Sequence, residues 1–197
     1  PCDVGVNTCK TPISWEHVRR CNEITTEMQN CSPISVTKNQ HSSYSTSSPY
    51  RYCVMVERNN FPLDIATQGP GLQSYKAQPA HTITLCPPLQ IINLLPYELR
   101  FHIITSLVIA TIKPGQECSV HFINVLEPFN IEFAMDDYPQ SNHITINPGP
   151  NRDYIMPLEL TDSRKRQLIL NVSVSLITNW PSALVITIYA PIWILNK

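Results

Sequence analysis

The sequence has few charged residues, and neither sign is in clear excess. Only 15% of its 197 residues are charged, and the formal net charge is −1 at pH 7. Proteins that bind nucleic acid need a strongly basic surface, so we expect no nucleic-acid partner. An average soluble domain has about 25% charged residues. Part of this surface is therefore expected to face other parts of a longer protein.

Long apolar runs, glycine-rich loops and catalytic motifs are also missing. No stretch approaches the roughly 18 consecutive apolar residues that suggest a membrane-spanning helix. Only five glycines are present, and Gly69 and Gly71 flank a proline in a loop turn rather than in a phosphate-binding loop. The sequence has no G-x-S-x-G, P-loop, G-x-G-x-x-G or H-E-x-x-H pattern. We therefore expect no enzyme, no catalytic residue and no cofactor.

The polar residues that are candidates for a site are scattered along the sequence. The Asp136-Asp137 pair is typical of a turn, and its surroundings supply too few oxygen ligands for calcium. The cluster Arg164-Lys-Arg166 is interpreted as a solvated hairpin tip, with an anionic lipid headgroup or acidic partner as the alternative. Six histidines lack metal-ligand spacing and are expected to be solvated: His17, His41, His81, His102, His121 and His143. No metal site is predicted.

The seven cysteines leave two interpretations open. Their number is odd and no C-x-x-C pair exists, which favours free thiols in a reducing compartment over zinc or a disulfide framework. Cys53 and Cys86 lie in apolar stretches and are expected to be small buried hydrophobic residues. A secreted, disulfide-containing β-sandwich of the receptor or adhesion type is the alternative. The cysteines are Cys2, Cys9, Cys21, Cys31, Cys53, Cys86 and Cys118.

From residue 50 onward, apolar and polar residues alternate with period two. The alternation is clearest in residues 50–57, 97–103 and 168–176, and proline, glycine, asparagine and aspartate mark the breaks between such runs. This pattern makes one face of each strand apolar, which is typical of antiparallel sheets that pack face to face. The predicted fold is all-β, built of antiparallel β-sandwich repeat modules. The expected core includes Tyr97, Leu99, Phe101, Leu168, Leu170, Val172, Val174 and Ile186.

Residues 1–49 differ from the rest of the chain. A serine-rich stretch at 42–49 indicates a linker or loop. Before it, apolar residues from Trp15 to Met28 recur at three- and four-residue spacing after Ser14, a possible N-cap. We expect irregular structure here with a possible short helix, although the β-branched run that begins at Ile24 weakens the helical pattern.

A short phrase occurs twice in the chain. Residues 88–93 read Pro-Leu-Gln-Ile-Ile-Asn, and residues 191–196 read Pro-Ile-Trp-Ile-Leu-Asn, each after a β-like run. Asn93 and Asn196 lie 103 positions apart, which is the size of one β-sandwich module. We expect residues 50–87 to be the closing strands of one module, residues 88–190 to be a complete module, and residues 191–197 to begin the next. Arrays of this kind usually present binding surfaces.

The two repeated asparagines are the candidate functional residues. An asparagine at the end of an apolar strand can bond neighbouring backbone groups through both its amide and its carbonyl. Asn93 and Asn196 are therefore expected to brace the junction between modules, and direct ligand contact is the alternative.

These phrases carry a family resemblance. Residues 87–99 and 189–197 are similar to the repeat starts of the adaptor-binding (VAB) domain in the vacuolar protein sorting-associated protein 13 family, whose repeats carry an asparagine at the positions of Asn93 and Asn196. The resemblance is specific around residues 81–103 and 183–197, plausible over 50–180, and absent from 1–49. In that family the adaptor-binding repeats that capture peptides lie late in the array, whereas the closing phrase here is more similar to an early-to-middle boundary.

The resemblance implies a function and a location. Members are cytosolic, rod-like proteins that bridge organelles such as the endoplasmic reticulum, mitochondria, endosomes or lysosomes, and lipid droplets. They carry glycerophospholipids along a groove that lies elsewhere in the protein. Their adaptor-binding domain recruits membrane-anchored adaptors, in known cases through short Pro-x-Pro peptides. The expected partners here are therefore such adaptors and the neighbouring repeats, with the extracellular β-sandwich as the runner-up from a different class.

Overall fold

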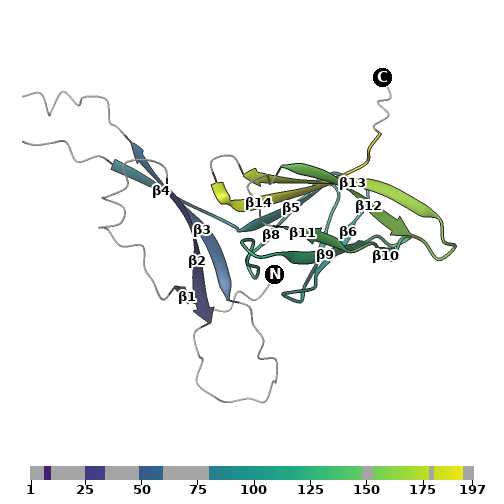
Figure 1. Ribbon diagram of the computed structural model, residues 1–197, viewed down its shortest axis with the longest axis horizontal. Coiled ribbons are helices and arrows are strands. Elements are labelled where there is room, and N and C mark those ends of the chain that lie inside the picture. The colour runs from purple at the N-terminus through teal and green to yellow at the C-terminus, as the bar shows by residue number, and fades with distance from the viewer. Residues whose placement is uncertain are drawn as a thin grey trace, which may run out of the picture.

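The computed structural model describes residues 7–9, 25–33, 49–59, 80–147, 153–177 and 180–192. Within these ranges all the regular secondary structure is β-strand. The strands form one separate four-stranded sheet and a two-sheet sandwich (Figure 1). The predicted all-β class is confirmed.

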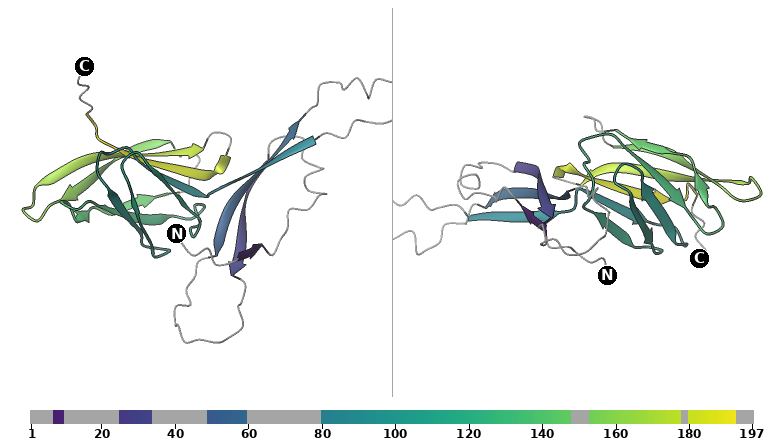
Figure 2. Two further views of the ribbon diagram at one scale, coloured as in Figure 1. Left: turned by 180° about the vertical axis from the view of Figure 1, so that it is seen from behind. Right: turned by 90° about the horizontal axis from the view of Figure 1, so that it is seen from below.

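The first sheet precedes the sandwich in the chain. Its strands are β1 (Asn7–Cys9), β2 (Thr25–Pro33), β3 (Tyr50–Asn59) and β4 (Ala80–Cys86), and they pair antiparallel in that order. Seen from behind and from below, this sheet lies beside one end of the sandwich (Figure 2). Only Pro87 and Pro88 separate β4 from the first strand of the sandwich, so the two units are closely linked.

The expectation of irregular or helical structure before residue 50 is wrong for two segments. Residues 7–9 and 25–33 are strands, and Met28 is paired with Cys53 of β3. The β-branched residues at the start of β2 favour extended backbone, and pairing with β3 satisfies the backbone groups that a helix would have bonded internally. Residues 10–24, which held most of the helical pattern, lie outside the described residues.

The sandwich has one sheet of six strands and one of four. The larger sheet has the order β10-β12-β13-β14-β5-β8, and the smaller has the order β11-β9-β6-β7. The strands of the larger sheet are β5 (Leu89–Asn93), β8 (Glu117–Val120), β10 (Gln140–Ser141), β12 (Tyr154–Thr161), β13 (Gln167–Ile177) and β14 (Trp180–Tyr189). Those of the smaller sheet are β6 (Leu99–Ile103), β7 (Val108–Ile112), β9 (Phe129–Ala134) and β11 (Ile144–Ile146).

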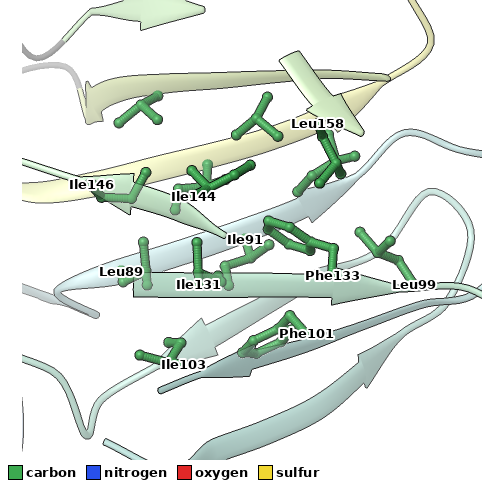
Figure 3. Close-up of a cluster of buried hydrophobic side chains, with 14 of the residues drawn as sticks. Leu89, Ile91, Leu99, Phe101, Ile103, Ile131, Phe133, Ile144, Ile146 and Leu158 are labelled. Carbon is green, nitrogen blue, oxygen red and sulfur yellow. The ribbon is translucent and has the colours of Figure 1, made fainter. Parts of the chain in front are cut away.

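The apolar faces of the two sheets meet in one core. In β5, β6 and β9, every second residue is buried, as period-two alternation requires. Side chains such as Ile91, Phe101 and Phe133 point into the space between the sheets (Figure 3). Each fully buried Leu, Ile or Phe side chain stabilises the fold by about 1.5–3 kcal/mol relative to exposure. The core therefore holds the two sheets together.

Most of the expected core is buried, with two exceptions. Leu99, Phe101, Leu170, Val172, Val174 and Ile186 are at most 3% exposed. Leu168 is only partly buried and packs against the core from its margin. Tyr97 is 64% exposed, so its assignment to the core is wrong. It lies in a bend before β6 begins at Leu99, where alternation no longer determines which way a side chain points.

One strand pair of the sandwich is parallel. β14 pairs with β5 in parallel, with Ile188 opposite Asn93, whereas all other strand pairs in the described residues are antiparallel. The first and last strands of the sandwich are thus neighbours in the larger sheet. The pairing places the end of β5 beside the end of β14, where the chain leaves the sandwich.

The first sheet has the same arrangement as part of the larger sandwich sheet. The order β1-β2-β3-β4 corresponds to β10-β12-β13-β14, with antiparallel pairing throughout. The 103-residue offset matches Ile83 with Ile186, and their partners across the strands are Val56 and Val174. The sequence repeat and the strand register therefore agree on which positions are equivalent. Val56 matches Val174, and six residues earlier Tyr50 matches Leu168.

Candidate functional site

Asn93 is the last residue of β5 and is completely buried. Its side-chain Nδ2 donates to the carbonyl oxygens of Tyr97, at 2.8 Å, and Ile112, at 3.0 Å. Its Oδ1 accepts a hydrogen bond from the backbone N–H of Leu95 at 3.0 Å. One amide thus connects the bend after β5 with the end of β7, in the other sheet of the sandwich.

The backbone of Asn93 is also fully engaged. Its N–H donates to the carbonyl of Gln116 at 2.9 Å, and its carbonyl accepts from the N–H of Gly115 at 2.8 Å. Gly115 has a φ of 67°, a conformation that glycine adopts without steric cost. The turn between β7 and β8 is therefore fastened to Asn93, as is the bend before β6.

The second repeated asparagine, Asn196, lies outside the described residues. Sequence reasoning expected both asparagines to bond nearby backbone groups, and for Asn93 two of the three partners are within four residues. The bond to Ile112, 19 residues away, could not be inferred from local sequence. The role of the pair as braces stays a prediction.

The first sheet contacts the sandwich through an aromatic cluster. The Tyr50 ring stacks on His121 with 4.4 Å between the ring centroids, and Phe122 meets Tyr50 edge-on at 5.6 Å. The N–H of Arg51 donates to the carbonyl of His121 at 2.9 Å, and Nδ1 of His121 lies 2.9 Å from the carbonyl oxygen of Arg51. The expectation that His121 is simply solvated is wrong, because β3 covers it.

A second contact between the first sheet and the sandwich is apolar. Cys53 of β3 and Ala183 of β14 are both completely buried and belong to the same small apolar cluster. Met28, Met55 and Cys86 pack against this cluster. Cys53 and Cys86 are opposite each other on β3 and β4, and neither they nor Cys118 form a disulfide in the described part of the chain. A hydrogen bond from Cys53 to Cys86 lowers the pKa of Cys86 and raises that of Cys53, to which burial also contributes.

The structure brings together a few of the scattered polar residues. Glu132 lies between His143, at 3.0 Å, and His102, at 3.5 Å. Asp136 and Asp137 form the expected turn, and Asp136 is 3.6 Å from Arg100 on the surface. Exposed ion pairs of this kind add little stability. Within the described ranges, no group of three or more His, Cys, Asp or Glu residues could hold a metal ion.

The basic cluster at 164–166 is a hairpin tip, as its sequence suggested, but it has an acidic partner within the hairpin. Asp162 is 8% exposed, and its Oδ1 accepts from the backbone N–H groups of Arg164, at 2.8 Å, and Arg166, at 2.7 Å. Its Oδ2 accepts from Nε of Arg166 at 2.6 Å. Lys165, with a φ of 61°, takes the left-handed position of the turn.

We expect this hairpin to be sensitive to acid. Burial raises the pKa of Asp162, but the hydrogen bonds from Arg166 and Arg164 outweigh burial and hold it below its usual value. The stabilisation of the folded state by the Asp162 carboxylate is therefore complete above the unfolded pKa of about 3.9, and it is lost as the pH falls through the folded pKa. Chemical unfolding should show that Asp162→Asn is less stable than the native chain at pH 7, and that the difference narrows in acid. An equal difference at both ends of the pH range would contradict this.

A groove opens where the chain leaves the sandwich. It has a volume of about 690 Å³ and lies beside the bend that Asn93 fastens. Its lining is mainly apolar and includes Leu95, Tyr97, Met135, Leu168, Leu170 and Ala190. Sequence reasoning missed this groove because it assigned Tyr97 to the core, whereas Tyr97 is exposed and lines the groove.

The described residues contain no helix long and apolar enough to cross a membrane. The surfaces of the described part include sheet faces, strand edges and the groove beside Ala190.

Comparison with known proteins agrees with the repeat phrases. Residues 3–197 match the family model of the vacuolar-sorting associated protein 13 adaptor-binding domain. The chain is 30% identical over 200 residues to the intermembrane lipid transfer protein VPS13D of Homo sapiens, a match that covers 100% of this chain and 4% of that protein. It is 34% identical over 120 residues to Vps13D of Drosophila melanogaster, which covers 60% of this chain and 3% of that protein.

The chain thus spans only a small part of the length of these relatives. The resemblance carried by the repeat phrases is confirmed, and it extends to residues before position 50, where sequence reasoning had found none. The chain belongs to the vacuolar-sorting associated protein 13 family, as part of its adaptor-binding domain.

Proposed function

We propose that this chain is a non-catalytic interaction module that recruits a lipid-transfer protein to membranes by binding adaptor proteins. The observation that carries the proposal is the match of residues 3–197 to an adaptor-binding domain. Two named relatives are intermembrane lipid transfer proteins, which supports a role in the same process. The alternative, an extracellular disulfide-containing sandwich, is disfavoured by this kinship.

The partners that fit this function are membrane-anchored adaptors, bound through short Pro-x-Pro peptides, and the neighbouring repeats of the same protein. Lipid would bind elsewhere in the longer protein. The module would then act in the cytoplasm, peripherally at contact sites between organelles such as the endoplasmic reticulum, mitochondria, endosomes or lysosomes, and lipid droplets. Its contribution is to place the transfer machinery, because binding an adaptor on one membrane fixes where that machinery works.

The repeat arrangement expected from the sequence is part of the proposal. Ile83 and Leu85 of β4 are 45% and 58% exposed, whereas Ile186 and Ile188 at the matching positions of β14 are completely buried. β4 is also the edge of its sheet, whereas β14 is paired on both sides. We interpret residues 50–87 as closing strands of a preceding repeat, extended backwards by β1 and β2. Residues 88–190 then form one complete repeat, and residues 191–197 begin the next.

Asn93 serves this function as a brace rather than as a ligand contact. It has no exposed surface, and its side-chain amide and backbone groups bond to five backbone groups of the chain itself. A buried amide in this position fixes the bends at the end of the sandwich from which the next repeat starts. Asn196 would do the same one repeat later.

Direct binding tests this proposal. The chain is immobilised and exposed to purified cytosolic segments of membrane-anchored organelle adaptors, first with and then without their Pro-x-Pro sequences intact. We expect saturable binding that weakens when those prolines are replaced. Alkylation of the denatured protein without reductant, read by mass spectrometry, addresses the alternative: labelling of all seven cysteines excludes the disulfide framework. Disulfide-linked cysteines together with no adaptor binding would favour the extracellular class.

A further inference from the structure

The described residues include a junction between two successive units, the first sheet and the sandwich. The start of β3 is seated on the loop that follows β8, where Tyr50 stacks on His121 and meets Phe122 edge-on. At the same point the N–H of Arg51 donates to the carbonyl of His121, and Nδ1 of the His121 ring lies within hydrogen-bond distance of the carbonyl oxygen of Arg51. The earlier unit is therefore fastened to the later one through the beginning of its third strand.

In the complete sandwich, the position equivalent to that of Tyr50 lies in the groove beside Ala190. Counting along β13 from the register match of Val56 with Val174, Tyr50 corresponds to Leu168. Leu168 lines the groove, and Ala190, which corresponds to Pro87 by the 103-residue offset, lines it too. At the first junction, between the first sheet and the sandwich, His121 and Phe122 fill this place. At the second junction, where the next repeat would follow the sandwich, the equivalent place is an apolar groove.

We propose that this groove is the docking site for the next repeat of the same protein, which enters it with the loop that corresponds to residues 121–122. This inference rests on the repeat arrangement proposed above. Two residues join β4 to β5 at the first junction, and a residue spans at most about 3.6 Å. With the same spacing, a following repeat would start roughly 10 Å from Tyr189, the end of β14. It is therefore held at the groove by the chain itself.

The lining of the groove suits such a loop. Tyr97 is 64% exposed and stands at its margin, available for the ring contact that Tyr50 makes at the first junction. Leu168 and Leu170 provide an apolar floor, and Leu168 is only partly buried. A loop that carries an aromatic residue, as Phe122 does, would cover this apolar surface and remove it from water.

The test compares this chain with a longer one that continues beyond Lys197 with the following sequence of the protein. Hydroxyl-radical footprinting reads the oxidation of Tyr97 and of Tyr138, which also lines the groove. We expect a several-fold drop in oxidation of both tyrosines in the longer chain. Tyr97→Lys should restore oxidation of Tyr138 there. The matched control Ile109→Lys, on β7 and 70% exposed, should not.

The melting temperatures of both variants in the shorter chain show whether they fold, since each changes an exposed side chain. Equal oxidation of Tyr97 in the two chains would overturn the inference. So would protection that appears only after a Pro-x-Pro peptide is added, because the occupant would then be a ligand. Adaptor binding by the longer chain is measured separately. Binding that persists without protection contradicts this inference alone, whereas protection without binding contradicts the proposed function alone.

Discussion

Replacing Ile186 by alanine should lower the free energy of unfolding by about 2–5 kcal/mol. Ile186 is completely buried between the sheets, so truncation removes buried apolar surface and leaves a cavity. The same change at Ile83, its equivalent one repeat earlier, should cost far less in this chain, because Ile83 is 45% exposed. Urea unfolding of the two variants, which carry the same chemical change at matching positions, measures the difference.

The comparison also tests the repeat arrangement. In a longer chain that includes the sequence before residue 1, a preceding half-sandwich would cover Ile83 and make Ile83→Ala as costly as Ile186→Ala. Equal costs for the two variants in the shorter chain would mean that Ile83 is already in a core. An unchanged, small cost for Ile83→Ala in the longer chain would mean that the first sheet is complete as it stands.

Replacing Asn93 by alanine should cost about 1–3 kcal/mol, because it leaves buried backbone groups of Leu95 and Ile112 without partners. The bond to the carbonyl of Tyr97 is also lost, and the bend before β6 is released. Asn142, whose exposed Oδ1 accepts one bond from the N–H of Glu159, is a matched control. Asn142→Ala should cost clearly less in the same thermal or urea unfolding experiment.

Asn93→Asp separates the hydrogen bonds from side-chain shape. A carboxylate has the same size but would face the carbonyl oxygens of Tyr97 and Ile112, which accept bonds from Nδ2 in the native chain. Burial and these acceptors favour the protonated acid, so its folded pKa should lie above the unfolded value of about 3.9. The variant should therefore be least stable above its folded pKa and regain stability as the pH falls from the folded pKa to the unfolded value of about 3.9. If Asn93→Ala abolishes adaptor binding without changing stability or solution shape, Asn93 belongs to a recognition surface instead.

The sequence predicts the strands well where one face of a strand is exposed to solvent and the other is buried. Alternation identified β6 and β13, because their odd and even residues lie in different environments. It failed at Tyr97, where the chain bends before β6 and the period no longer applies. It also missed β1 and β2, since the helical spacing around Met28 is short enough to arise by chance in a strand.

Contacts between distant segments were beyond reach of the sequence pattern. His121 was expected to be solvated because the sequence around it says nothing about Tyr50, which lies 71 positions earlier and covers it. The parallel pairing of β5 with β14 was equally hidden, because apolar alternation is the same for parallel and antiparallel neighbours. Asn93 could be found only because the phrase that contains it occurs twice. Its bond to Ile112 depends on how the two sheets are packed.

The measurement that tests the central claim most directly is recruitment of the full-length protein in cells. Residues 1–197 are deleted, and the distribution of the protein among organelles is compared with that of the intact protein by fluorescence microscopy and fractionation. The account predicts that organelle targeting is lost on deletion and restored when the native segment is put back. It predicts weaker restoration by a segment carrying Asn93→Ala. Unchanged targeting after deletion would contradict the account and would make the module purely architectural.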